Sequence, residues 1–182
     1  MAGICTLRPN VTREEAAHEL RSHGLRRILL NVVSGPLRRL AQIYVPFRLY
    51  RVHIRDGSRK QSMLLAVDAV SGKLDLFSFQ PFSDELIAVE TQSRNHVAAS
   101  LPEEKARDIL EASVRRMIFR AGFFRVCDLR IESELLIPEL HVPYWVGFRG
   151  KSESAMPVVL DAVRRRHEGA RVRQLILEWL AP

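Results

Sequence analysis

Cys127 and His141 are the two residues of this 182-residue chain whose types could supply a nucleophile and its base. An imidazole beside a thiol draws off its proton and makes the sulfur reactive. The simpler interpretation is that they are unrelated residues of two strands, with Cys127 a small buried side chain. Cys5, the other cysteine, has no spacing that pairs it with Cys127. The sequence therefore predicts no catalytic residue.

Phosphate and metal motifs are equally incomplete. Gly150-Lys151-Ser152 ends like a phosphate-binding loop, but Trp145 stands where that motif needs a glycine. His18 and His23 are five residues apart, so a helix would not present them on one face as it presents a pair four apart. We expect neither a bound metal nor a cofactor.

Asp68 and Asp161 each follow directly after an apolar stretch. An acid at the end of a strand can be catalytic. An Asp in this position more often accepts hydrogen bonds from nearby backbone N–H groups and shapes the turn that follows. We expect the structural role for both.

Positive charge is concentrated in one part of the chain. Lys and Arg number 28 against 21 Asp and Glu, a net charge of +7, and the stretch 21–60 holds ten basic residues and one acidic residue, Asp56. Six arginines of this stretch are the candidate binding residues, because a basic face attracts nucleic acid and acidic partners: Arg26, Arg27, Arg38, Arg39, Arg48 and Arg51. The acidic stretch that follows, 62–91, could neutralise such a face.

The elements that would position these residues occur twice in the sequence. Residues 14–20 resemble 103–109, an offset of 89. Later blocks match in the same order: Val45-Pro46-Phe47 with Val142-Pro143-Tyr144, and Asp68-Ala69-Val70 with Asp161-Ala162-Val163. Repeated blocks in a constant order are typical of a duplicated unit.

Each repeat reads as a helix followed by strands. Thr12 and Glu15 form a capping box, and Pro102 marks the start of the second helix. Ser34-Gly35-Pro36 and Gly122 are the expected helix ends. Strict alternation predicts a strand over 140–148, richness in β-forming residues predicts one over 44–54, and a short apolar run predicts one over 63–70. Residues 172–180 have helical spacing, although the repeat predicts a strand there.

These elements predict an α+β fold of two repeated units, each a helix packed on an antiparallel sheet. The expected domain organisation is a tail at 1–11, a first repeat at 12–80, a linker at 81–100 and a second repeat at 101–182. Pro46 and Pro143 indicate edge strands or bulges.

Three motifs of the first repeat resemble the PepSY domain, the propeptide-and-YPEB module. They are the helix that opens at Thr12 with Thr-x-Glu-Glu-Ala, the Tyr44-Val45-Pro46-Phe47 strand, and the closing segment from Val67 to Leu74. The resemblance covers 12–79 and recurs more weakly over 101–180. It implies a small, cystatin-like α+β unit that is not an enzyme and that regulates a peptidase or binds peptide.

Composition places the chain among ordinary globular proteins, with 47% hydrophobic and 27% charged residues. The first residues show no basic region followed by an apolar run, and no stretch reaches the roughly 20 apolar residues of a membrane span. We expect a soluble cytoplasmic protein.

The leading hypothesis is a non-enzymatic module that binds a protein or peptide partner. The alternatives are a nucleic-acid-binding protein that uses the 21–60 stretch, and a cystatin-like domain that binds a small ligand or catalyses a reaction. Whether the chain forms a homo-oligomer stays open.

Overall fold

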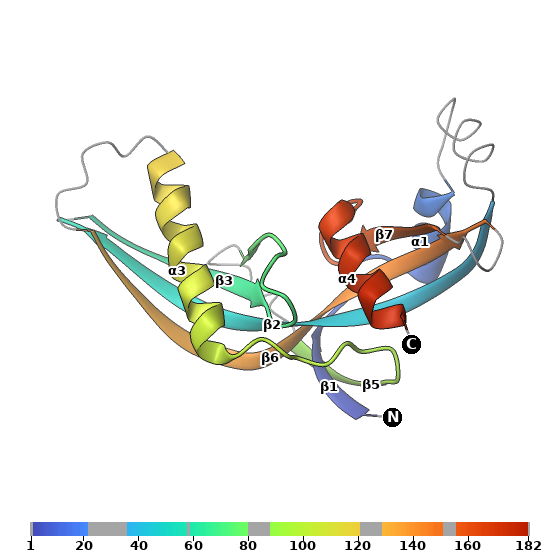
Figure 1. The fold of residues 1–182 in the computed structure, drawn as a ribbon, viewed down its shortest axis with the longest axis horizontal. Coiled ribbons are helices and arrows are strands. Elements are labelled where there is room, and N and C mark those ends of the chain that lie inside the picture. Colours follow the sequence, from blue (N-terminus) through green and yellow to red (C-terminus); the bar gives the residue numbers. More distant parts are fainter. Residues whose placement is uncertain are drawn as a thin grey trace. The chain divides into compact units, whose positions relative to one another are not determined.

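The computed structural model describes residues 2–21, 36–57, 59–79, 88–120, 129–150 and 156–181. Its helices and strands mix in chain order, and the sheet predominates (Figure 1). The expected α+β class is confirmed at this level. The elements are β1 (Ala2–Leu7), α1 (Arg13–Leu20), β2 (Leu37–Asp56), β3 (Arg59–Asp68), β4 (Phe77–Phe79), β5 (Ala88–Ser93), α3 (Glu103–Arg120), β6 (Leu129–Arg149), β7 (Met156–Asp161) and α4 (Ala170–Leu180).

The strands form one hydrogen-bonded sheet in the order β4-β3-β2-β6-β1-β5, and β7 pairs with β6 off this path. The pairs β2–β3, β3–β4 and β6–β7 are antiparallel, and β1 runs parallel to β6. The two long strands β2 and β6 have 20 and 21 residues. They are much longer than the segments 44–54 and 140–148 that the sequence predicts.

The chain divides into two compact units, each drawn from several segments. The first unit holds Met1–Val45, Val89–Val97 and His141–Pro182, and the second holds Pro46–Ala88 and Ala98–Leu140. Strands β2 and β6 therefore contribute to both units. Each of the ranges 12–80 and 101–182, which we expect from the sequence, is one continuous stretch of chain. That these two ranges are repeats of each other stays a prediction.

In the second unit, α3 packs on one face of the β2–β3 hairpin. Its residues Ala106, Leu110 and Val114 are fully buried against alternate residues of β2, Tyr50 and Val52 among them. These three positions are spaced so that they lie on one side of the helix. Met117, one turn further along α3, is 40% exposed.

In the first unit, α1 and α4 both lie against β7. Ala16 and Leu20 of α1 are buried with Leu160 of β7. In α4 the residues Val172 and Ile176, with Leu175, are buried on one side, which is the helical spacing seen in the sequence. The C-terminal segment is therefore a helix, and the strand that the repeat predicts there is wrong.

Pro46 and Pro143 do not mark edge strands, because β2 lies between β3 and β6, and β6 lies between β2 and β1. The β2–β3 register begins at Phe47 and the β6–β7 register begins at Tyr144, so each proline lies one residue before that antiparallel ladder. A proline at that point removes no donor from that ladder. Each proline carbonyl instead accepts a backbone hydrogen bond, Pro46 from Ala69 at 2.9 Å and Pro143 from Ala162 at 3.1 Å.

The start of α1 confirms the predicted capping box. The Thr12 hydroxyl accepts from the Glu15 N–H at 3.3 Å, and the Glu15 carboxylate accepts from the Thr12 N–H at 2.8 Å. Arg165 pairs with the same carboxylate. The Thr12 N–H, and then the Arg165 guanidinium, hold the pKa of Glu15 below its ordinary value of 4.5. α1 ends at Leu20 with Arg21 as its C-cap, well before Ser34-Gly35-Pro36, so the expected end of this helix is wrong. Gly122, the expected end of α3, lies outside the described residues.

We expect Glu15→Gln to lower the melting temperature at neutral pH and to have less effect as the pH falls. A carboxylate whose pKa is lower in the folded protein stabilises it above the ordinary pKa of 4.5, and that contribution is lost as the pH falls through the lowered folded pKa. Thermal unfolding of both proteins from neutral to strongly acidic pH measures the difference. Glu14→Gln, which removes the neighbouring acid of the same turn, is the control. An equal pH dependence in the two variants would contradict the assignment.

Candidate binding surface

The six arginines predicted to form a basic face do not gather within the part of the chain that the structure describes. Arg26 and Arg27 lie outside it. Arg38 and Arg39 are exposed neighbours on β2 in the first unit. Successive side chains of a strand point to opposite faces, so these two do not share one.

Arg48 and Arg51 belong to the second unit and are both engaged within it. The guanidinium of Arg48 donates to the Leu101 carbonyl at 2.7 Å and to the Pro138 carbonyl at 3.1 Å. Arg51 forms an ion pair with Glu134 of β6 at 3.0 Å. Their positions on β2 differ by three, so they project to opposite faces of the strand. Neither is a free cation on a shared surface.

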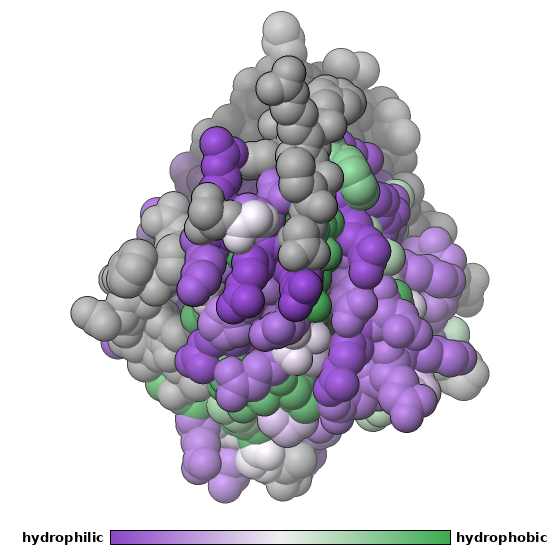
Figure 2. Space-filling model, turned by 90° about the vertical axis from the view of Figure 1, so that its left-hand side faces the viewer, coloured by the Kyte–Doolittle hydropathy of each residue, from purple (hydrophilic) through white to green (hydrophobic). Residues whose placement is uncertain are grey.

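The second unit nevertheless presents a charged sheet face on the side away from α3. Residues of β2 alternate between buried and exposed from Arg51 to Arg55. Hydrophilic residues predominate in the view toward the end where the β2–β3 hairpin turns (Figure 2). The exposed charged and polar side chains of this outer face come from three strands: Arg51, His53 and Arg55 of β2, Lys60 and Ser62 of β3, and Arg130, Glu132 and Glu134 of β6.

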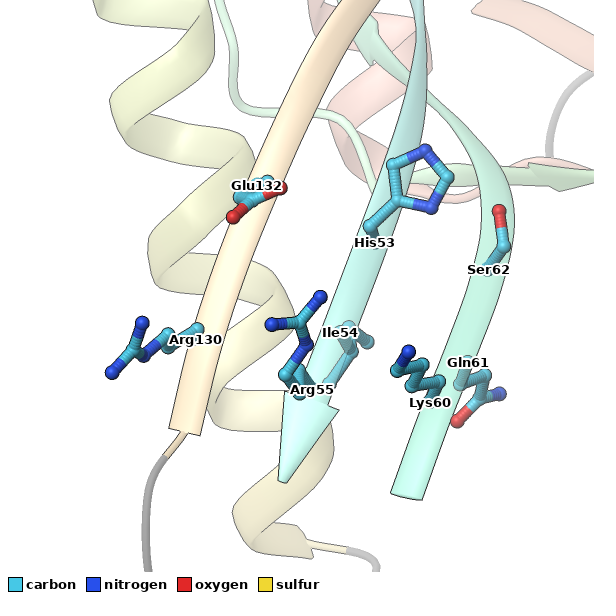
Figure 3. A pocket seen from close by; sticks show the side chains of 8 residues that line it. All are labelled: His53, Ile54, Arg55, Lys60, Gln61, Ser62, Arg130 and Glu132. Carbon is cyan, nitrogen blue, oxygen red and sulfur yellow. The ribbon is translucent and has the colours of Figure 1, made fainter. Parts of the chain in front are cut away.

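A shallow hollow of about 260 Å³ lies on the outer face. Figure 3 shows His53 and Arg55 on the central strand, Lys60 and Ser62 on one neighbour, and the β6 residues on the other, with α3 behind the strands. Three cationic side chains and one carboxylate line it. This arrangement fits an anionic group better than a cation.

This face was not predicted from the sequence, because the prediction rested on the number of basic residues in a stretch and not on the alternation of polar and apolar residues. The signal was present: Arg51, His53 and Arg55 occupy every second position between Val52 and Ile54. A period of two with apolar residues between predicts one polar and one buried face.

Asp68 has the structural role that the sequence predicts. Its carboxylate is buried, and it accepts from the Val70 N–H at 2.8 Å, the Ser71 N–H at 3.2 Å and the Ser71 hydroxyl at 2.6 Å. Gly72 completes this turn with a φ of +67°. The carboxylate therefore organises the turn after β3 and does not face the outer hollow.

Asp161 shapes the turn after β7 in the same manner. It accepts from the Val163 and Arg164 N–H groups, both at 2.8 Å, and pairs with the Arg164 guanidinium at 2.6 Å. Arg165 follows with a φ of +54°, the one non-glycine residue with a positive φ in the described ranges, and it reaches Glu15 of α1. The structural expectation is confirmed for both acids.

Cys127, the nucleophile of the pair that the sequence analysis considered and did not favour, lies outside the described residues. His141 is buried, with its Nδ1 3.2 Å from the Cys5 carbonyl oxygen. Burial, and then the charge of Glu90, raise the pKa of the Cys5 thiol, which disfavours the reactive thiolate. Lys151 and Ser152 of the phosphate-loop remnant, and His23, also lie outside the described part.

Within the described ranges, no group of three or more His, Cys, Asp and Glu side chains could hold a metal ion. No helix in those ranges is long and apolar enough to cross a membrane. No protein-family model, curated protein or solved structure matches this chain.

We expect Asp68→Asn to lower the free energy of unfolding by about 1–3 kcal/mol, because an amide NH2 replaces one acceptor oxygen and faces buried donors. Urea unfolding measures the change. The control is Asp108→Asn on the exposed side of α3, which should stay within about 0.5 kcal/mol of the parent protein. Equal stability of the two variants would mean that the turn does not depend on the carboxylate.

Proposed function

We propose that the protein is a non-enzymatic binding module for a protein or peptide partner, and that the outer face of the second unit is its binding surface. The observation that carries the proposal is the open sheet face itself. It exposes side chains of both charge signs around a hollow of about 260 Å³, while α3 covers the opposite face. A surface with both signs of charge is complementary to another protein surface.

The side chains around the hollow support binding rather than catalysis. His53, Ser62 and Glu132 are types that serve in hydrolases, but each comes from a different strand. The structure records no hydrogen bond that joins any two of these three side chains. A catalytic base must reach the proton that it removes, directly or through one water.

A protein partner is favoured over nucleic acid. Glu132 and Glu134 stand on the same face as the cations, and Glu134 offsets the charge of Arg51. Carboxylates repel a continuous line of phosphates, whose binding depends on uninterrupted basic contacts. The nucleic-acid alternative stays a second hypothesis that the binding experiment below tests.

We also propose that the chain is a duplicated unit whose helices are exchanged between the sequence repeats. In the first unit Asn10 donates its N–H to the Ala162 carbonyl at 2.7 Å, and in the second Ser100 donates to Ala69 at 3.0 Å. The Asn10 side chain also donates to the Val163 carbonyl at 3.0 Å, and the Ser100 hydroxyl donates to the Val70 carbonyl at 2.9 Å. The hydrogen bonds of Asn10 and of Ser100 therefore have equivalent acceptors and similar lengths.

The residue after each of these positions supports the same equivalence. The Val11 carbonyl accepts from the Trp145 indole N–H at 2.9 Å, and the Leu101 carbonyl accepts from Arg48 at 2.7 Å. In sequence, Trp145 follows Arg48 by 97 residues, which is the offset of the Val-Pro-aromatic blocks. Each helix thus packs on a strand of the other repeat, α1 on β7 and α3 on β3. The two core clusters also include residues of the helix's own repeat, Leu37 with α1 and Ile131 with α3.

The resemblance to the PepSY domain supports a related role, because that resemblance implies peptide binding or regulation of a peptidase. The part of the resemblance with a visible physical basis is the closing motif from Asp68 to Leu74, whose acid organises its turn.

Binding at the outer face is tested by a backbone amide NMR titration of the isotope-labelled chain. Extended peptides of acidic, basic and neutral composition are added, with an oligonucleotide as a further ligand. We expect at least one peptide to shift amides of 51–55, 60–64 and 130–134, because these strands carry the surface. Shifts confined to other segments, or a response to the oligonucleotide alone, would contradict the proposal.

The proposed exchange of helices between the two sequence repeats is tested by cleavage at a protease site introduced between residues 80 and 88. We expect the two pieces to elute together in native size-exclusion chromatography, because α1 packs on β7 and α3 packs on β3 across the cut. The same sample in urea should resolve into two species, which serves as the control. Separation under native conditions would refute the exchanged arrangement.

A further inference from the structure

The outer face of the second unit brings two like charges into direct opposition. The β2–β3 register pairs Arg55 with Lys60, and the next pair on the same face is His53 with Ser62. Residues directly opposite in an antiparallel pair project to one side of the sheet with their Cβ atoms about 4.5–5.5 Å apart. Two cations at this spacing repel each other, so an anion placed between them gains from both.

Neither cation of this pair is neutralised within the part of the chain that the structure describes. Arg55 and Lys60 are both exposed, and no ion pair is recorded for either of them. Arg51, two pairs further along the same face, differs because Glu134 lies 3.0 Å from its guanidinium. On the outer face, Arg51 is thus compensated by Glu134, whereas no ion pair within the described ranges compensates Arg55 or Lys60.

The groups beside the cation pair complete a site for an anion. The Ser62 hydroxyl can donate a hydrogen bond, and the His53 imidazole can donate through a ring N–H. The hollow that these four residues line, about 260 Å³, has room for a side-chain carboxylate (Figure 3). Arginine presents a planar fork that matches the two oxygens of a carboxylate.

We propose that Arg55 and Lys60, with His53 and Ser62, form a subsite that binds a carboxylate side chain of an extended acidic segment in a protein partner. This inference rests on the proposed binding function and names the chemistry of the partner at that surface. Glu132 at the rim of the hollow limits how much negative charge the face accepts. A partner segment with Asp or Glu at intervals, separated by neutral residues, offers a carboxylate to the cation pair and keeps further negative charge away from Glu132. A polyphosphate, with its continuous negative charge, does not.

The test is fluorescence anisotropy of the full chain with a labelled peptide of alternating Glu and Thr at low salt. We expect Lys60→Gln and Arg55→Gln each to weaken binding of this peptide roughly tenfold, as the loss of one charge-assisted contact does. Lys105→Gln is the matched control, because it removes the same charge from an exposed position on α3 and should leave the affinity unchanged. All three residues are exposed, and thermal unfolding verifies that the variants fold.

The outcomes separate the subsite from the general function. If peptides of Gln and Thr or of Lys and Thr bind as well as the acidic one, or if Lys60→Gln behaves like Lys105→Gln, the subsite is refuted while the binding module stands. If none of the three peptides binds, the proposed function fails as well. Tighter binding of an oligonucleotide than of the acidic peptide, lost in Lys60→Gln, would assign the cation pair to nucleic acid and overturn the proposal.

Discussion

The strict alternation of β2 is the constraint on which the second unit depends. Val52 and Ile54 point to α3, so Arg51, His53 and Arg55 must point away from it. Burial of a large apolar side chain stabilises a fold by about 1.5–3 kcal/mol, and two exposed charges 4 Å apart in water repel by only about 1 kcal/mol. The apolar face therefore sets the register, and the opposition of Arg55 and Lys60 follows from it. A slip by one residue would relieve the repulsion but would move the whole buried set into solvent.

Local features of the structure could be predicted from the sequence, and distant ones could not. The capping box at Thr12 and the turns at Asp68 and Asp161 depend on groups within a few residues, and each forms as expected. The partners of Arg48 and Arg51 could not be predicted, because they lie 53 to 90 residues away in the sequence. The density of charge along the chain does not show which carbonyl and carboxylate groups of distant segments bind these arginines.

The proposed duplication concerns the order of blocks in the sequence, and the segments that pack together do not follow that order. The sequence blocks align residue 14 with 103, an offset of 89. The buried pairs Ala16 with Ala106 and Leu20 with Leu110 have an offset of 90, as do the first residues of α1 and α3. Under the proposed duplication, burial therefore aligns the two helices one residue away from the match of acids and alanines in the sequence. Adjacency in sequence also favoured pairing each helix with the strands that follow it, but α1 packs on β7 and α3 packs on β3.

The proposed duplication gives a physical reason for placing the binding surface in one unit. Gly72 and Arg165 occupy the same turn position, four residues after the buried acid, and both have a positive φ. A side chain at Gly72 would meet Ile109 of α3 at 2.4 Å, so that turn packs directly on its helix. Arg165 instead reaches Glu15 of α1, and the neighbouring Arg164 pairs with Asp161. In the first unit, arginines near the turn thus hold elements together, whereas in the second unit Arg55 and Lys60 have no such structural task and are available to a ligand.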